Sequence, residues 1–174
     1  MSELEEEWAQ ALADAETRAR ASGRGDIADY LSLRASNDLA RKAATDWLFS
    51  TFTACAGEAN RGGASVQIAQ TDGHRFRVGN ATMVGKLLTL SLGVRSMMIE
   101  AGWPRAPGDG FIRGGGLAGG HVRHFGNRAA DEELLLVRST QGAPQWFALE
   151  KTGTRSEFLE ERARRHVTMF LGQA

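Results

Sequence analysis

The spacing of apolar residues divides the chain into three regions. Residues 2–59 carry apolar side chains at every third or fourth position, which is the period of an α-helix with one buried face. Residues 155–171 show the same period. Between these ends, across 64–150, apolar and polar residues alternate at about every second position, as is typical of strands. The pattern therefore predicts helices at both ends of the chain and strands in the middle.

Two helices are predicted in the N-terminal region. The first begins at Ser2, where Glu5 completes the spacing of a capping box, and it ends at the glycines of 22–25. The second begins at Asp26 and is expected to break or bend around 34–38, because Ser36, Asn37 and Asp38 are better suited to capping a helix than to its interior.

Three hairpins are predicted in the middle region. Their turns fall at Asp72 and Gly73, at Gly93, and at 140–143. Reversals this short give antiparallel pairing, because a parallel crossover needs about a dozen residues or more. We therefore predict an α+β protein with an antiparallel sheet of about six strands over 64–150. The N-terminal helices and the one C-terminal helix are expected to pack on one face of this sheet.

Length and composition narrow the class of protein. A chain of 174 residues predicts a single domain over 1–174. Lysine plus arginine and aspartate plus glutamate both number 21, so the basic surplus typical of nucleic-acid-binding proteins is missing. The start of the chain is acidic, and no apolar run approaches the roughly 20 residues that cross a bilayer, so no membrane association is predicted. The single cysteine, Cys55, makes a cytoplasmic location the default expectation.

Residues 102–126 form a glycine-rich tract that holds nine of the 21 glycines. Residues 114–119 match G-x-G-x-x-G, but no helical pattern follows, so we do not predict a dinucleotide site. His121 and His124 would meet on a helix but point to opposite faces of a strand, and the glycines favour a strand. We therefore predict neither a metal site nor a cofactor. His166, beside the apolar face of the last helix, is expected at the core edge with a carbonyl or carboxylate partner.

Charge and rigidity suggest a role for the glycine-rich tract. From 102 to 128 it carries four arginines and one aspartate, a local charge of plus three. Aromatic and arginine side chains on a proline-stiffened loop are typical of recognition surfaces, and arginine can bind carboxylate or phosphate in a bidentate manner. We therefore predict a non-enzymatic binding or regulatory domain for an anionic small molecule or an acidic segment of a protein partner. The predicted recognition residues are Trp103, Arg105, Asp109, Arg113, His121, Arg123 and His124, with Glu100 at the end of the preceding strand.

Three alternatives stay open. A small hydrolase or transferase could use His121 or His124 as a general acid or base, with Glu100 orienting one of them and arginines holding an anionic transition state. The glycine-bearing strand could pair with a second copy across a two-fold axis and form a homo-oligomer. The glycines could also be purely structural, covered by large side chains or by another part of the backbone.

Overall fold

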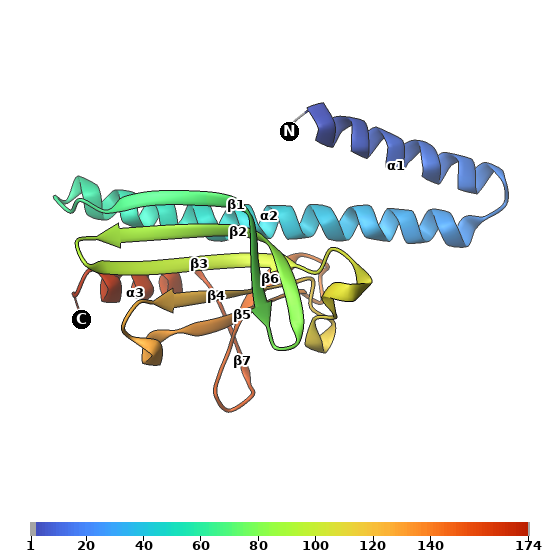
Figure 1. Ribbon diagram of the computed structural model, residues 1–174. Coiled ribbons are helices and arrows are strands. Elements are labelled where there is room, and N and C mark those ends of the chain that lie inside the picture. The colour runs from blue at the N-terminus through green and yellow to red at the C-terminus, as the bar shows by residue number, and fades with distance from the viewer. Residues whose placement is uncertain (1–2, 174) are drawn as a thin grey trace. The chain divides into compact units, whose positions relative to one another are not determined.

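The computed structural model describes residues 3–173, and these form three α-helices and one seven-stranded antiparallel sheet (Figure 1). The predicted α+β class is confirmed. The helices are α1 (Glu3–Ala21), α2 (Gly25–Arg61) and α3 (Glu160–Phe170). The strands are β1 (Gln67–Val78), β2 (Ala81–Leu92), β3 (Arg95–Trp103), β4 (Ala118–His124), β5 (Glu132–Arg138), β6 (Pro144–Leu149) and β7 (Arg155–Glu157).

The chain divides into two compact units, Met1–Lys42 and Ala43–Ala174. The first unit is a helical hairpin of α1 and the beginning of α2, with Gly23 at positive φ in the connection. The second unit contains the rest of α2, the sheet and α3. The break expected around 34–38 was a wrong prediction, because α2 is helical throughout this stretch. The capping box at Ser2 lies outside the described residues.

Each strand of the sheet pairs with the next one along the chain. The predicted turns at Gly93 and Gly142 are confirmed, and both glycines have the positive φ that a tight turn requires. The first turn was wrongly predicted. Asp72 and Gly73 form a bulge inside β1, where Gly73 has a φ of 65°, and the chain turns instead at Gly79.

The C-terminal helix begins later than predicted. Residues 155–157 were expected in the helix but form β7, which pairs with β6 through Phe147, Ala148 and Leu149. Backbone pairing with an existing strand decides the conformation of this short segment. The sheet therefore has seven strands, and α3 starts at Glu160.

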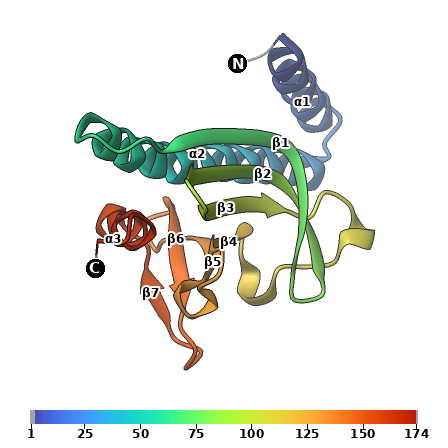
Figure 2. The ribbon, with the colours of Figure 1, turned by 60° about the vertical axis from the view of Figure 1, so that its left-hand side comes forward.

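Within the second unit, α3 and the part of α2 from residue 43 onward cover one side of the sheet, which we call the helix face (Figure 2). The indole N–H of Trp146 on β6 donates to the carbonyl oxygen of Ala44 on α2 at 2.9 Å. The ring of Phe52 lies 6.1 Å from that of Phe158, which precedes α3. Phe52 and Phe158 are fully buried, so the main core lies between this face, α2 and α3.

The opposite side, which we call the outer face, is partly covered by the sheet itself. The end of the β1–β2 hairpin curls across this face (Figures 1 and 2). Phe76, Ala81 and Met83 form a second small core there, with Val78 and Ile112 packed against it. Gly119 of β4 lies beneath this hairpin end, because a β-carbon added to it would lie 3.4 Å from Cε of Met83 and 3.5 Å from Cγ2 of Val78.

Glycines also let neighbouring backbones come together. A β-carbon on Gly120 would overlap the carbonyl oxygen of Glu100 on β3. A β-carbon on Gly102 would lie 2.7 Å from the carbonyl of Val84 on β2, and one on Gly85 would overlap Ala101. These strand glycines are therefore covered by the protein's own backbone and side chains, and they permit the curl of the sheet.

Replacement of Gly120 by alanine tests this close approach. The new methyl group would be forced against paired backbone, so we expect the free energy of unfolding to fall by about 1–3 kcal/mol or more. Urea denaturation measures the change. Gly108→Ala is the matched control, because a β-carbon there meets no atom within 4 Å and φ is not positive. Equal stability of the two variants would contradict the proposed role of Gly120.

Candidate functional site

The proline-containing loop after β3 is held by its own side chains. The guanidinium of Arg105 lies 3.8 Å from the ring centroid of Trp103 and donates to the carbonyl oxygen of Val84 at 2.9 Å. A carboxylate oxygen of Asp109 accepts from the backbone amides of Arg105 and Ala106 at 3.0 and 3.1 Å. The ring of Trp103, the guanidinium of Arg105 and the carboxylate of Asp109 thus contribute to closing this loop against β2.

Strand β4 separates the other predicted residues. His121 pairs with Glu100 and points to the outer face, whereas His124 pairs with Met97 and points to the helix face. The opposite orientation expected for a strand is observed. Arg113 lies apart from both histidines in a short 3-10 turn, Arg113–Gly115.

Both edges of β4 are occupied within the sheet. The strand pairs with β3 on one side and with β5 on the other. A strand without a free edge has no unpaired backbone groups to offer a second copy. Oligomerisation through the glycine-bearing strand therefore conflicts with the observed topology.

On the outer face, one carboxylate binds two imidazoles and a guanidinium, and we call these four residues the outer cluster. Oε2 of Glu100 lies 2.7 Å from Nε2 of His74, and Oε1 lies 2.9 Å from Nδ1 of His121. Nη2 of Arg123 lies 3.0 Å from Oε1. Phe76 stacks on His74 at a centroid distance of 5.5 Å and meets the edge of His121 at 6.0 Å.

Electrostatics fixes the protonation pattern of the outer cluster. Burial opposes ionisation of Glu100, but hydrogen bonds from His121 and His74 and the charge of Arg123 lower its pKa overall. An ionised carboxylate can only accept hydrogen bonds, so Nδ1 of His121 and Nε2 of His74 carry protons. In the neutral imidazoles, the remaining nitrogens, Nε2 of His121 and Nδ1 of His74, are then free to accept.

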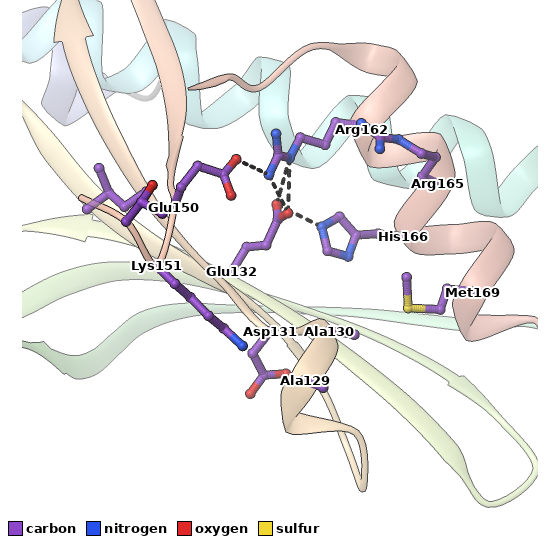
Figure 3. A pocket seen from close by; sticks show the side chains of 12 residues that line it. Ala129, Ala130, Asp131, Glu132, Glu150, Lys151, Arg162, Arg165, His166 and Met169 are labelled. Atoms are coloured by element: carbon purple, nitrogen blue, oxygen red, sulfur yellow. Dashed lines mark hydrogen bonds and ion pairs between the residues drawn. The ribbon is translucent and has the colours of Figure 1, made fainter. Parts of the chain in front are cut away.

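On the helix face, a second chain of polar groups links β4, β5 and α3, and we call it the inner network. Nε2 of His124 lies 2.8 Å from Nδ1 of His166, whose Nε2 lies 3.0 Å from a carboxylate oxygen of Glu132. Arg162 donates to Glu132 at 2.6 Å and to Glu150 at 3.0 Å. Figure 3 shows the guanidinium between the two carboxylates and the ring of His166 directed at Glu132.

Contacts within the inner network shift the pKa values of Glu132 and His124. Burial would raise the pKa of Glu132, but hydrogen bonds from His166 and Arg162 lower it to about 2. Burial and the neighbouring His166 lower the pKa of His124, so this imidazole is neutral at pH 7. His124 and His166 are both buried. The structure also places His166 at the core edge with a carboxylate partner, as the sequence indicated.

Two pockets adjoin the inner network. The first, of about 470 Å³, lies against α3 and is lined by Ala129, Ala130, Asp131, Glu132, Leu149, Glu150, Lys151, Thr152, Arg162, Arg165, His166 and Met169 (Figure 3). The second, of about 590 Å³, we call the Arg128 pocket. It is lined by Met98, Arg123, His124, Phe125, Gly126, Arg128 and Asp131.

The Arg128 pocket is where the two groups of polar residues meet. Arg123 belongs to the outer cluster and His124 to the inner network, and both line this pocket. A carboxylate oxygen of Asp131 is occupied by the backbone amide of His124 at 2.7 Å. Within the part of the chain that the structure describes, no carboxylate lies within ion-pair distance of Arg128. The pocket therefore contains an arginine without an ion-pair partner among the described residues, and the carboxylate of Asp131 lines the same pocket.

Other kinds of site find less support. Among residues 3–173, no group of three or more histidine, cysteine, aspartate and glutamate side chains is arranged to hold a metal ion. Cys55 is buried on α2, and burial raises the pKa of its thiol. No helix within this range is long and apolar enough to cross a membrane.

Comparison of the chain with protein families, with curated proteins and with solved structures finds no match. The functional proposals below therefore depend on the geometry of the two clusters and their pockets.

The coupling of Glu132 to His166 and Arg162 predicts a specific acid sensitivity. The pKa of Glu132 is about 2 in the folded protein against an ordinary value of 4.5, so its ionised form stabilises the fold above pH 4.5. This contribution is lost as the pH falls from 4.5 toward 2. We expect the free energy of unfolding to fall more steeply over this range in the wild-type protein than in Glu132→Gln.

Urea denaturation at a series of pH values measures the difference. Glu133→Gln changes the exposed carboxylate next to Glu132 and should follow the wild-type curve. Parallel curves for the wild-type protein and the Glu132 variant would show that the coupling contributes nothing to stability.

Proposed function

We propose that the protein binds an anionic small molecule in the Arg128 pocket. The observation that carries this proposal is that Arg128, which lacks a carboxylate partner among the described residues, lines one pocket together with Arg123 and His124. Guanidinium groups form strong hydrogen bonds with carboxylates and phosphates, because donor geometry and charge both match. Arg123, His124 and the following Phe125 and Gly126 extend this site from the glycine-rich tract.

The lining of the pocket favours a ligand with an apolar part as well as a charge. Phe125 is 75% exposed, and the side chain of Met98 lies on the same pocket wall. Phe125 can pack against an aromatic or aliphatic group while Arg128 binds the anion. A volume of about 590 Å³ falls in the range usual for small-molecule sites, which supports a small molecule as the ligand.

Acid–base catalysis at the outer cluster is a second candidate function. It is favoured by one specific observation: the buried carboxylate of Glu100 orients His74 and His121 through one nitrogen each. In a hydrolase or transferase of this kind, the other nitrogen of His121 would accept or donate the proton. Arg123 would stabilise a developing negative charge beside it.

Titration with inorganic phosphate and with succinate tests the binding proposal. Two-dimensional NMR spectra should show shifts of the backbone amides of Phe125, Gly126 and Arg128 on addition of either anion. We expect Arg128→Ala to weaken binding at least about tenfold, because it removes the guanidinium that would bind the anion. Binding should also weaken with added salt.

Arg77→Ala is the matched control, since Arg77 is an exposed arginine on β1 outside the pocket lining. It should bind both anions as the wild-type protein does. Equal loss of binding in both arginine variants would show that only the net charge of the protein matters. Undiminished binding in the Arg128 variant would refute anion binding in the Arg128 pocket.

A further inference from the structure

We infer that His124 is a general base in the Arg128 pocket and that the substrate is an ester carrying a negative charge. Glu132 and His166 act behind His124 as positioning residues, in one chain of hydrogen bonds from β5 through α3 to β4. This inference rests on the proposed function, because Arg128 would hold the anionic group of the substrate.

The hydrogen bonds of the inner network assign each proton. Glu132 is ionised and can only accept, so Nε2 of His166 carries a proton and donates to it. When the ring of His166 is neutral, its Nδ1 is then an acceptor, so Nε2 of His124 carries a proton and donates at 2.8 Å. The lone pair of His124 is thereby placed on Nδ1, the nitrogen that is not used in the chain.

Nδ1 of His124 is accessible from outside the fold. The described residues provide no hydrogen-bond partner for this nitrogen. Among described side chains that are not exposed, only Thr45 has a fully buried polar atom without a partner. Nδ1 of His124 therefore contacts solvent, and His124 lines the Arg128 pocket.

The network also provides a place for the positive charge that His124 acquires. When Nδ1 takes up a proton, the proton on Nε2 can pass to Nδ1 of His166 across 2.8 Å. The charge then lies on His166, next to the carboxylate of Glu132 at 3.0 Å. On His124 itself, burial and His166 oppose a positive charge, whereas the carboxylates of Asp131 and Glu132 favour it.

In the proposed step, Nδ1 of His124 removes a proton from water while the water oxygen attacks the acyl carbon of the ester. A new carbon–oxygen bond forms, the bond between the acyl carbon and the ester oxygen breaks, and the departing alkoxide receives the proton from His124. Arg123 lines the same pocket and can stabilise the negative charge that develops on the acyl oxygen. Atoms and charges balance without any further reactant.

Hydrolysis of mono-4-nitrophenyl glutarate, an anionic ester, is compared with that of neutral 4-nitrophenyl acetate. We expect faster hydrolysis of the anionic ester, with kcat rising through the ionisation of His124 at a pH below 6.5. His124→Gln should lower kcat about 100-fold or more. Glu132→Gln should lower kcat and shift its pH profile with little change in KM, whereas Glu133→Gln should match the wild-type protein.

The tautomers of the wild-type protein give a test that needs no variant. Long-range ¹H–¹⁵N spectra at pH 7.5 should show His124 and His166 protonated at Nε2. The Nδ1–H tautomer of His124, equal rates for wild type and His124→Gln, or no hydrolysis beyond that by free imidazole would each overturn the inference. Phosphate binding at Arg128 is measured separately, so its loss would refute the proposed function without altering the tautomer result.

A second inference concerns the helical hairpin of the first unit and rests on different observations. Its buried apolar residues among 3–42 are alanines, namely Ala19, Ala28 and Ala40. Five of its larger apolar side chains are exposed instead, namely Leu4 (74%), Trp8 (56%), Tyr30 (62%), Leu33 (58%) and Leu39 (70%), whereas Leu12, Ile27 and Leu31 are half-buried. About 40 residues whose only buried apolar side chains are alanines bury too little apolar area to be stable alone, so the exposed side chains favour a further packing partner.

We propose that this partner is the hairpin of a second copy of the chain. The acidic residues of α1 include Glu3, Glu6 and Glu7 in its first turns, whereas Arg18 and Arg20 lie in its last turn. Two copies of α1 packed antiparallel would place the acidic end of each beside the basic end of the other. Leu4 and Trp8, four residues apart, would lie on one face within such an interface.

Light scattering after size exclusion at micromolar concentrations tests self-association. We expect a mass near twice 18.8 kDa, and Trp8→Glu should reduce it to that of one chain. Val94→Glu is the control, because Val94 is 95% exposed in the second unit, and its mass should equal that of the wild-type protein. A monomeric wild-type protein, or a Trp8 variant that remains dimeric, overturns this proposal.

Discussion

The close approach of β3 to β4 at Gly120 is the constraint on which the arrangement of the second unit depends. A β-carbon at this position would overlap the backbone of Glu100, and Gly119 beside it lies under Val78 and Met83. Bare backbone here allows the end of the β1–β2 hairpin to curl over the outer face. His74 and Phe76 thereby come into contact with Glu100 on β3 and His121 on β4.

Strand alternation then gives the glycine-rich tract two chemical environments. His121 and Arg123 join a partly exposed cluster around Glu100, whereas His124 is buried against His166. Each imidazole is oriented by hydrogen bonding, in the first case directly by a carboxylate and in the second through another imidazole. The Arg128 pocket lies where these environments adjoin, so ligand binding and proton transfer would share the same short stretch of β4.

Local signals explain which elements the sequence predicts well. Turns at Gly93 and Gly142 need only positive φ and adjacent strand patterns, both of which the sequence shows. Asp72 and Gly73 carry the same turn signal, but whether a glycine ends a strand or forms a bulge depends on what the strand pairs with. The three residues of β7 likewise become a strand only because β6 offers a free edge.

In the candidate site, too, contacts between adjacent strands can be predicted from the sequence, whereas contacts between distant segments cannot. Glu100 and His121 are paired on the adjacent strands β3 and β4. The alternation of side chains within each strand can be predicted from the sequence. Glu132 and His166 are 34 residues apart, and their contact arises from how α3 crosses the sheet. No spacing in the sequence encodes that crossing. The sequence likewise does not indicate that the guanidinium of Arg105 donates to the carbonyl oxygen of Val84 on β2 and so holds the loop.

The bulge at Asp72 and Gly73 has a consequence for how the protein behaves at high concentration. An open sheet exposes a row of backbone donors and acceptors at each edge, which can recruit strands from other molecules into fibrous aggregates. In β1, one edge of the sheet, the bulge breaks the regular register of this row. At the other edge, β7 is only three residues long. Neither edge is a long uninterrupted template, which favours a protein that stays dispersed in a crowded solution.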